Sequence, residues 1–121
     1  MGEWKSARGL LERALKSLTD DRAGEAATWH DLASIDLKEG HYPAAREKIA
    51  RGLATRQAIG DRAGEAATWH DLASIDVDEG HYPAAREKVA RSLAIMQAIG
   101  DRAGEAATFF QFGVLAFKLG R

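Results

Sequence analysis

The sequence has no cysteine, only two prolines and no apolar run long enough to cross a membrane. The absence of cysteine excludes a disulfide framework and thiolate zinc sites. A membrane-spanning helix needs about 20 consecutive apolar residues, and no signal-peptide pattern opens the chain. We therefore expect a cytoplasmic protein with no membrane partner. The 17 basic and 18 acidic residues give a formal charge of −1, so no cationic field favours a nucleic-acid partner.

What the sequence does have is an internal repeat of 40 residues. Residues 20–59 and 60–99 differ at seven positions, and "DRAGEAAT" recurs a third time from Asp101. Residues 2–15 also align with residues 40–53. The sequence thus divides into a half repeat (2–19), two repeats (20–59 and 60–99) and a half repeat (100–121), which we expect to form one domain over 1–121. Near-identical copies fit recent duplication, engineering or a piece of a longer array, and the sequence does not separate these origins.

Each 40-residue unit predicts two helices in an all-α fold. Aspartates that can cap free amides precede the first helix, and a glycine that can take the left-handed conformation ends it. A first-turn proline, Pro43 or Pro83, begins the second helix. Because the connections are short, neighbouring helices are antiparallel. The six predicted helices, in about three pairs, span residues 3–18, 21–39, 42–58, 61–79, 82–98 and 101–119.

Large and small apolar residues recur in phase with this period. The first copy carries Trp29, Leu32, Ala33, Gly40, Tyr42, Ala45 and Ile49; the second carries Trp69, Leu72, Ala73, Gly80, Tyr82, Ala85 and Val89; the third carries Phe109, Phe112, Gly113, Ala116 and Gly120. This spacing resembles the tetratricopeptide repeat (TPR) family, whose pattern is W-x2-L-G-x2-Y followed by A-x3-F. The period of 40, in place of 34, resembles the long-repeat subgroup of kinesin light chains and bacterial signalling proteins. The family's usual tyrosine is replaced by Asp36 and Asp76, and its closing proline is missing.

The resemblance implies a right-handed α-α superhelix, a solenoid in which the first helix of each pair lines a concave groove. It implies a protein-interaction scaffold that binds a peptide or protein segment there, and it implies neither catalysis nor a cofactor. On a helical wheel, a second stripe lies beside the packing face of Trp29, and this stripe is the expected groove surface. The predicted partner-binding residues are His30, Asp31, Ser34, Leu37, Lys38, His70, Asp71, Ser74, Val77, Asp78, Phe110, Gln111, Val114, Phe117 and Lys118.

These polar residues admit three other interpretations. Solvated surface without a ligand is as compatible with the pattern as a groove, because fold alone does not establish function. A Ser34, His30 and Asp31 relay lacks an oxyanion hole, since amides inside a helix are already bonded. His30 and His70 lack a third zinc ligand. We therefore predict a non-enzyme with no metal site, and Asp31 argues against binding of a chain-terminal carboxylate.

Asp36 and Asp76 fall at the centre of the packing face, where a carboxylate needs a partner. They also lie in the last turn of a helix, where the dipole disfavours an acid. Arginines recur one turn after the start of the second helix of each unit, next to where these aspartates lie. We expect structural ion pairs between Asp36 or Asp76 and members of the set Arg8, Arg46 and Arg86, or hydrogen bonds from the hydroxyls of Tyr42 and Tyr82.

The first and last predicted helices are unusually apolar, and the helix that would cover each in a continued array is absent from the sequence. Large exposed apolar patches mark interfaces. We expect a homo-oligomer, formed head-to-tail or as an isologous dimer. The runner-up function is therefore a structural self-assembly module. The predicted self-association residues are Trp4, Leu11, Leu15, Phe109, Phe112 and Leu119.

Overall fold

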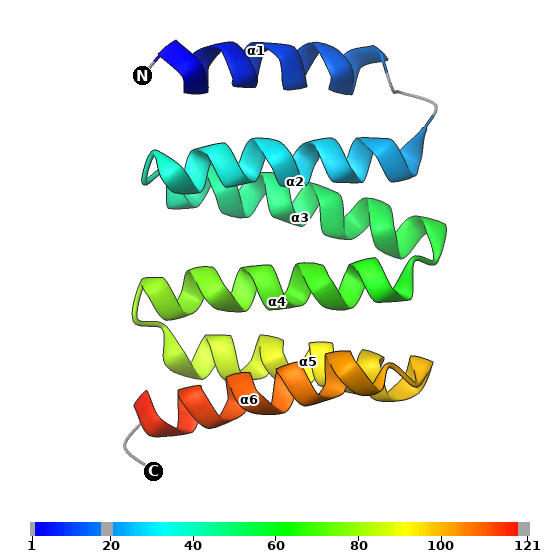
Figure 1. The fold of residues 1–121 in the computed structure, drawn as a ribbon, viewed down its shortest axis with the longest axis vertical. Coiled ribbons are helices and arrows are strands. Elements are labelled where there is room, and N and C mark those ends of the chain that lie inside the picture. The colour runs from blue at the N-terminus through cyan, green and yellow to red at the C-terminus, as the bar shows by residue number, and fades with distance from the viewer. Residues whose placement is uncertain (1, 18–20, 119–121) are drawn as a thin grey trace. The chain divides into compact units, whose positions relative to one another are not determined.

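The computed structural model describes residues 2–17 and 21–118, except for the side chains of residues 2–5 and 15–17. The described backbone forms six helices in the order of Figure 1: α1 (Gly2–Ser17), α2 (Arg22–Lys38), α3 (Tyr42–Ile59), α4 (Arg62–Asp78), α5 (Tyr82–Ile99) and α6 (Arg102–Lys118). The predicted all-α fold of six helices is confirmed, and each bound within the described residues is correct to within one residue.

The chain divides into two compact units between Gly60 and Asp61, at the boundary between the two full repeats. In the N-terminal unit, residues 1–60, α2 and α3 form a helical hairpin and α1 packs on α2. In the C-terminal unit, residues 61–121, α4 and α5 form the equivalent hairpin and α6 packs on α5. That the whole chain acts as one repeat domain stays a prediction.

Repeated caps set the ends of these helices. The Asp61 carboxylate accepts a hydrogen bond of 3.0 Å from the backbone N–H of Gly64, which satisfies one of the free amides of the first turn. Asp21 and Asp101 make the same bond at 2.9 Å. Because these aspartates are caps, each of these helices begins one residue later than predicted. The turns that follow α2, α3, α4 and α5 contain glycines in the left-handed conformation, with φ between 74° and 79°: Gly40, Gly60, Gly80 and Gly100.

Small residues let the paired helices approach closely. Ala33 and Ala45 are 1% and 0% exposed in the N-terminal unit, and their counterparts Ala73 and Ala85 are both 0% exposed. In the C-terminal unit, these two alanines form a core with Val89 and with Leu115 of α6; Val77, Tyr82 and Phe112 pack against its edge. This core positions α6 beside the α4 and α5 hairpin and thereby creates the site described below.

Candidate functional site

A hollow of about 490 Å³ opens between α4 and α6 of the C-terminal unit. Its lining combines aromatic and aliphatic side chains with one carboxylate, one imidazole, a hydroxyl and an amide. Seven of the predicted partner-binding residues meet here: His70, Ser74, Val77 and Asp78 from α4, and Phe110, Gln111 and Val114 from α6. Ala107 and Leu115, which were not among the predicted residues, complete the lining.

A smaller hollow of about 230 Å³ continues the first one toward the beginning of both helices. The two hollows share His70 and Ala107. The smaller one also contains Asp71 of α4, Met96 of α5 and Gly104 of α6. We call the continuous surface formed by both hollows the α4–α6 groove.

Helical periodicity explains why these side chains share one surface. On α4 they recur at spacings of four and seven from His70, and on α6 at spacings of three, four and seven from Ala107, which is one face of a helix in each case. Leu115, 1% exposed, belongs to both the groove lining and the core. Phe110 and Val114 remain 76% and 37% exposed. The groove therefore has an apolar wall that is open to solvent and a buried leucine at its base.

The serine hydroxyls of the two full repeats are hydrogen-bonded within their own helices. The Ser74 hydroxyl donates to the backbone carbonyl of His70 at 3.1 Å, one turn back in its own helix, and Ser34 does the same to His30 at 3.1 Å. Each serine hydrogen is thus directed to a carbonyl and away from an imidazole base. Gln111 is half-buried, and its carbonyl oxygen is buried without a hydrogen-bond partner in the described part of the chain.

The other predicted partner-binding residues lie outside these hollows. In the N-terminal unit, α2 exposes His30, Asp31 and Lys38, while Ser34 and Leu37 are half-buried. At the end of α6, Phe117 is 84% exposed. The exposed side chain of Lys118 extends over the ring of Tyr82, 5.9 Å from the ring centroid.

The buried aspartate of the N-terminal unit lies between two cations. Asp36 is 2% exposed; Arg8 of α1 approaches one carboxylate oxygen at 2.8 Å and Lys48 of α3 the other at 2.6 Å. Burial acts to raise the pKa of Asp36, but the hydrogen bonds from Lys48 and Arg8 outweigh it and hold that pKa below its ordinary value. Burial likewise acts to lower the pKa of Arg8, but its bonds to Asp36 and Glu39 raise it.

Arg8 was among the predicted partners of the buried aspartates, whereas Lys48 and Lys88 were not. In the C-terminal unit, Lys88 binds Asp76, also 2% exposed, at 2.6 Å. The available signal was the lysine that follows each aspartate by 12 residues in both copies. Tyr42 donates no hydrogen bond to Asp36 in the described structure. Arg46 is half-buried, whereas Arg86 is exposed and forms no ion pair with any described residue.

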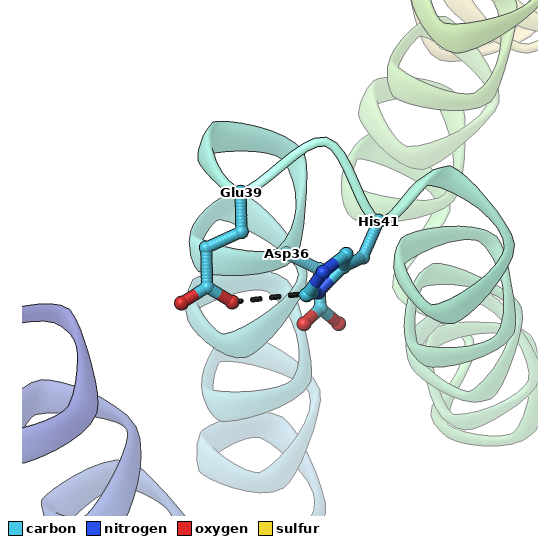
Figure 2. Close-up of side chains that lie close together, drawn as sticks. All are labelled: Asp36, Glu39 and His41. Atoms are coloured by element: carbon cyan, nitrogen blue, oxygen red, sulfur yellow. Dashed lines mark ion pairs between the residues drawn. The ribbon is translucent and has the colours of Figure 1, made fainter. Parts of the chain in front are cut away.

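The end of α2 also gathers a set of possible metal ligands. One ligand atom each from Asp36, Glu39 and His41 lies within 4.8 Å of the others, and Figure 2 shows the His41 ring beside the two carboxylates, with its Nδ1 3.5 Å from Glu39. Arg8 bonds to both carboxylates and Lys48 to that of Asp36. These two cations already neutralise the acidic charge that would attract a metal ion. The cluster is best explained as an internal charge network that joins the three helices of the N-terminal unit.

The described members of the predicted self-association set differ in exposure. Phe109 of α6 is 52% exposed, but Phe112, one turn later, packs half-buried against the core of the C-terminal unit. Leu11 of α1 is half-buried. Trp4, Leu15 and Leu119 lie outside the residues whose side chains are described. The exposed aromatic surface of α6 is formed instead by Phe109, Phe110 and Phe117.

Trp29 and Trp69, which are equivalent in the two repeats, are each covered by an arginine. The guanidinium of Arg51 lies 5.3 Å from the ring centroid of Trp29, and that of Arg91 lies 5.0 Å from Trp69. Both distances suit a cation–π interaction. The Trp69 indole N–H also donates to Glu65 at 3.3 Å. These half-buried rings are thus held within their own hairpins.

Comparison with solved structures identifies the fold. The chain aligns over 98% of its length with BtubC (BKLC) from P. vanneervenii, with a TM-score of 0.84 and 22% identity. It aligns equally far with a Podosopora anserina protein described as a kinesin light chain with nearly identical TPR-like repeats, with a TM-score of 0.75 and 19% identity. The fold is TPR-like.

The predicted resemblance is therefore confirmed at the level of the fold. The TPR-like chain spans 51% of BtubC and 60% of the Podosopora anserina protein. No family model and no curated protein sequence matches it. A TPR-like fold is generally a protein-interaction scaffold. No described helix is both long and apolar enough to cross a membrane.

Proposed function

We propose that this TPR-like chain is a protein-interaction scaffold that binds a peptide segment in the α4–α6 groove, without catalysis and without a cofactor. The observation that carries the proposal is the groove itself: exposed Phe110 and Val114 line it together with the buried Leu115. Small binding sites are typically concave and mostly apolar, with a few polar groups that fix orientation. The groove has this composition, and eight of the predicted partner-binding residues line it.

Binding would be measured by selecting peptides from a random display library on the intact chain and titrating the selected peptides by fluorescence anisotropy. Val114→Arg and Phe110→Arg place a charge in the apolar wall, and we expect each to weaken binding at least about tenfold, as is common for central apolar contacts. Phe109→Arg is the matched control, because Phe109 is exposed on the same helix and does not line the groove. Equal losses in all three variants, or no selected peptide, would contradict the proposal.

Self-assembly through α6 is a second candidate function. Its specific support is the exposure of Phe109, Phe110 and Phe117, 52%, 76% and 84% respectively. Three exposed phenylalanines on one helix form an apolar surface of the kind that marks a protein interface. This candidate makes the opposite prediction for Phe109→Arg, which would then weaken association.

A further inference from the structure

We propose that the α4–α6 groove selects peptide segments that carry a lysine or arginine close to a bulky apolar residue. This inference rests on the proposed function and names the chemistry of the partner. It starts from the charge of the groove: Asp78 lines the larger hollow and Asp71 the smaller one. No lysine or arginine is among the described residues that line either hollow.

Asp78 is placed to pair with a cation from outside the chain. It is exposed at the end of α4, next to the half-buried Val77, and makes no ion pair with any described residue. Lys118 at the end of α6 is a cation of the same unit, but its ammonium lies over the ring of Tyr82. The carboxylate therefore borders the apolar lining without a counterion among the described residues.

The repeat itself indicates that this charge is particular to the second copy. The two full repeats are identical over their polar groove stripe except where Lys38 of the first copy becomes Asp78 in the second. The substitution reverses the charge at a position that borders the apolar wall. A solvated surface would tolerate either residue, whereas a binding surface with two different charges distinguishes two kinds of partner.

Gln111 adds a second feature that favours a donor-rich partner. Its side chain lines the groove. The carbonyl oxygen of that side chain is buried and accepts no hydrogen bond from any described residue. An unpaired buried acceptor is unfavourable. After a change of rotamer it can accept from a backbone N–H of any peptide or from the ammonium or guanidinium of a basic one, whereas an ionised carboxylate has no hydrogen to donate. The apolar wall would take the bulky residue, and Asp78 the basic one.

The test uses the intact chain and the same random-peptide selection. We expect enriched peptides to carry Lys or Arg within a few residues of Phe, Leu, Ile, Met or Trp. A selected peptide is then synthesised with blocked ends in two forms that differ only by Lys or Glu at the basic position. We expect the Lys form to bind about three- to tenfold more tightly, the range for one partly exposed ion pair against a repulsive one.

The charge-reversal variant Asp78→Lys, which installs the residue of the first copy, should invert this preference. The control is Glu87→Lys, which changes the net charge equally, because Glu87 is exposed on α5 outside both hollows. This control should leave unchanged the ratio of affinities for the Lys and Glu forms of the peptide. Selected peptides that bind but show no basic preference, or equal effects of the two variants, would overturn the inference and leave the proposed function standing. Selection of no peptide, or binding insensitive to Val114→Arg, would overturn both.

Discussion

At the scale of single residues, the least expected feature is a carboxylate buried in a packing face. Asp36 is 2% exposed and lies in the last turn of α2, where the helix dipole disfavours an acid. Two cations from the neighbouring helices offset both costs, Arg8 at 2.8 Å and Lys48 at 2.6 Å. Because these bonds join α1, α2 and α3, Asp36 acts as a structural contact of the N-terminal unit.

We predict that Asp36→Asn lowers the free energy of unfolding by on the order of 2–4 kcal/mol at neutral pH, because two partly buried cations lose their counterion. The pKa of Asp36 is lowered in the folded state, so its contribution is complete above the unfolded value of about 3.9. It is lost as pH falls through that value toward the folded pKa. Urea unfolding of both proteins at a series of pH values measures the difference.

The control is Glu47→Gln, which removes an exposed pair with Arg51 at 3.6 Å and should change stability by less than about 0.5 kcal/mol. A stability difference between wild type and Asp36→Asn that stays the same from neutral pH down to strongly acidic pH would contradict the assignment. So would an Asp36→Asn effect no larger than that of Glu47→Gln.

At the scale of helices, the two hairpins are near-copies that differ at one contact between their paired helices. In the C-terminal unit, the hydroxyl of Ser92 in α5 donates to the Ala66 carbonyl of α4 at 3.0 Å. In the N-terminal unit, the equivalent residue is Gly52. A Cβ atom built at Gly52 lies 3.6 Å from the Ala26 carbonyl oxygen and 3.7 Å from Trp29, which is ordinary van der Waals contact, so a serine fits there.

We predict that Gly52→Ser stabilises the protein by about 1 kcal/mol, through better helix propensity and a hydrogen bond to the Ala26 carbonyl. The mirror variant Ser92→Gly should destabilise it by a similar amount. Urea unfolding measures both, and native-state hydrogen exchange would locate each change in its own hairpin. A loss of stability in Gly52→Ser would contradict the prediction, because it would mean that the space beside Gly52 does not accept a serine.

At the scale of the whole molecule, duplication supplies the elements but does not make the units equivalent. α6 begins with the same "DRAGEAAT" as α2 and α4 and then carries four phenylalanines, Phe109, Phe110, Phe112 and Phe117, of which only Phe110 takes the place of His30 and His70. One of these, Phe112, turns inward onto the core, while Phe109, Phe110 and Phe117 are exposed. The exposed ones form the apolar surface on which the second candidate function depends.

For self-assembly, we predict a molecular mass that rises with concentration in light scattering after size exclusion, because association buries these rings. The double variant Phe109→Arg/Phe117→Arg should remain a monomer at the same concentrations. Gln97→Arg, an exposed change on α5, is the control and should associate like wild type. A wild-type chain that stays monomeric at its highest soluble concentration would refute this function.

The sequence alone was sufficient for the repeat, the number of helices and their bounds. These features depend on local rules: capping by Asp61, left-handed glycine at Gly60, and a helical period that assigns each side chain to a face. The TPR-like fold followed from the same pattern. None of them requires knowledge of which helix lies beside which residue.

Only the tertiary structure decided which side chains meet. Lys48 reaches Asp36, Phe112 turns inward while Phe109 stays exposed, and Phe110 and Asp78 line one groove. Each outcome depends on the distance and rotation between two helices, which are set by packing of residues far apart in the sequence. A helical wheel assigns a residue to a face but does not show what that face contacts.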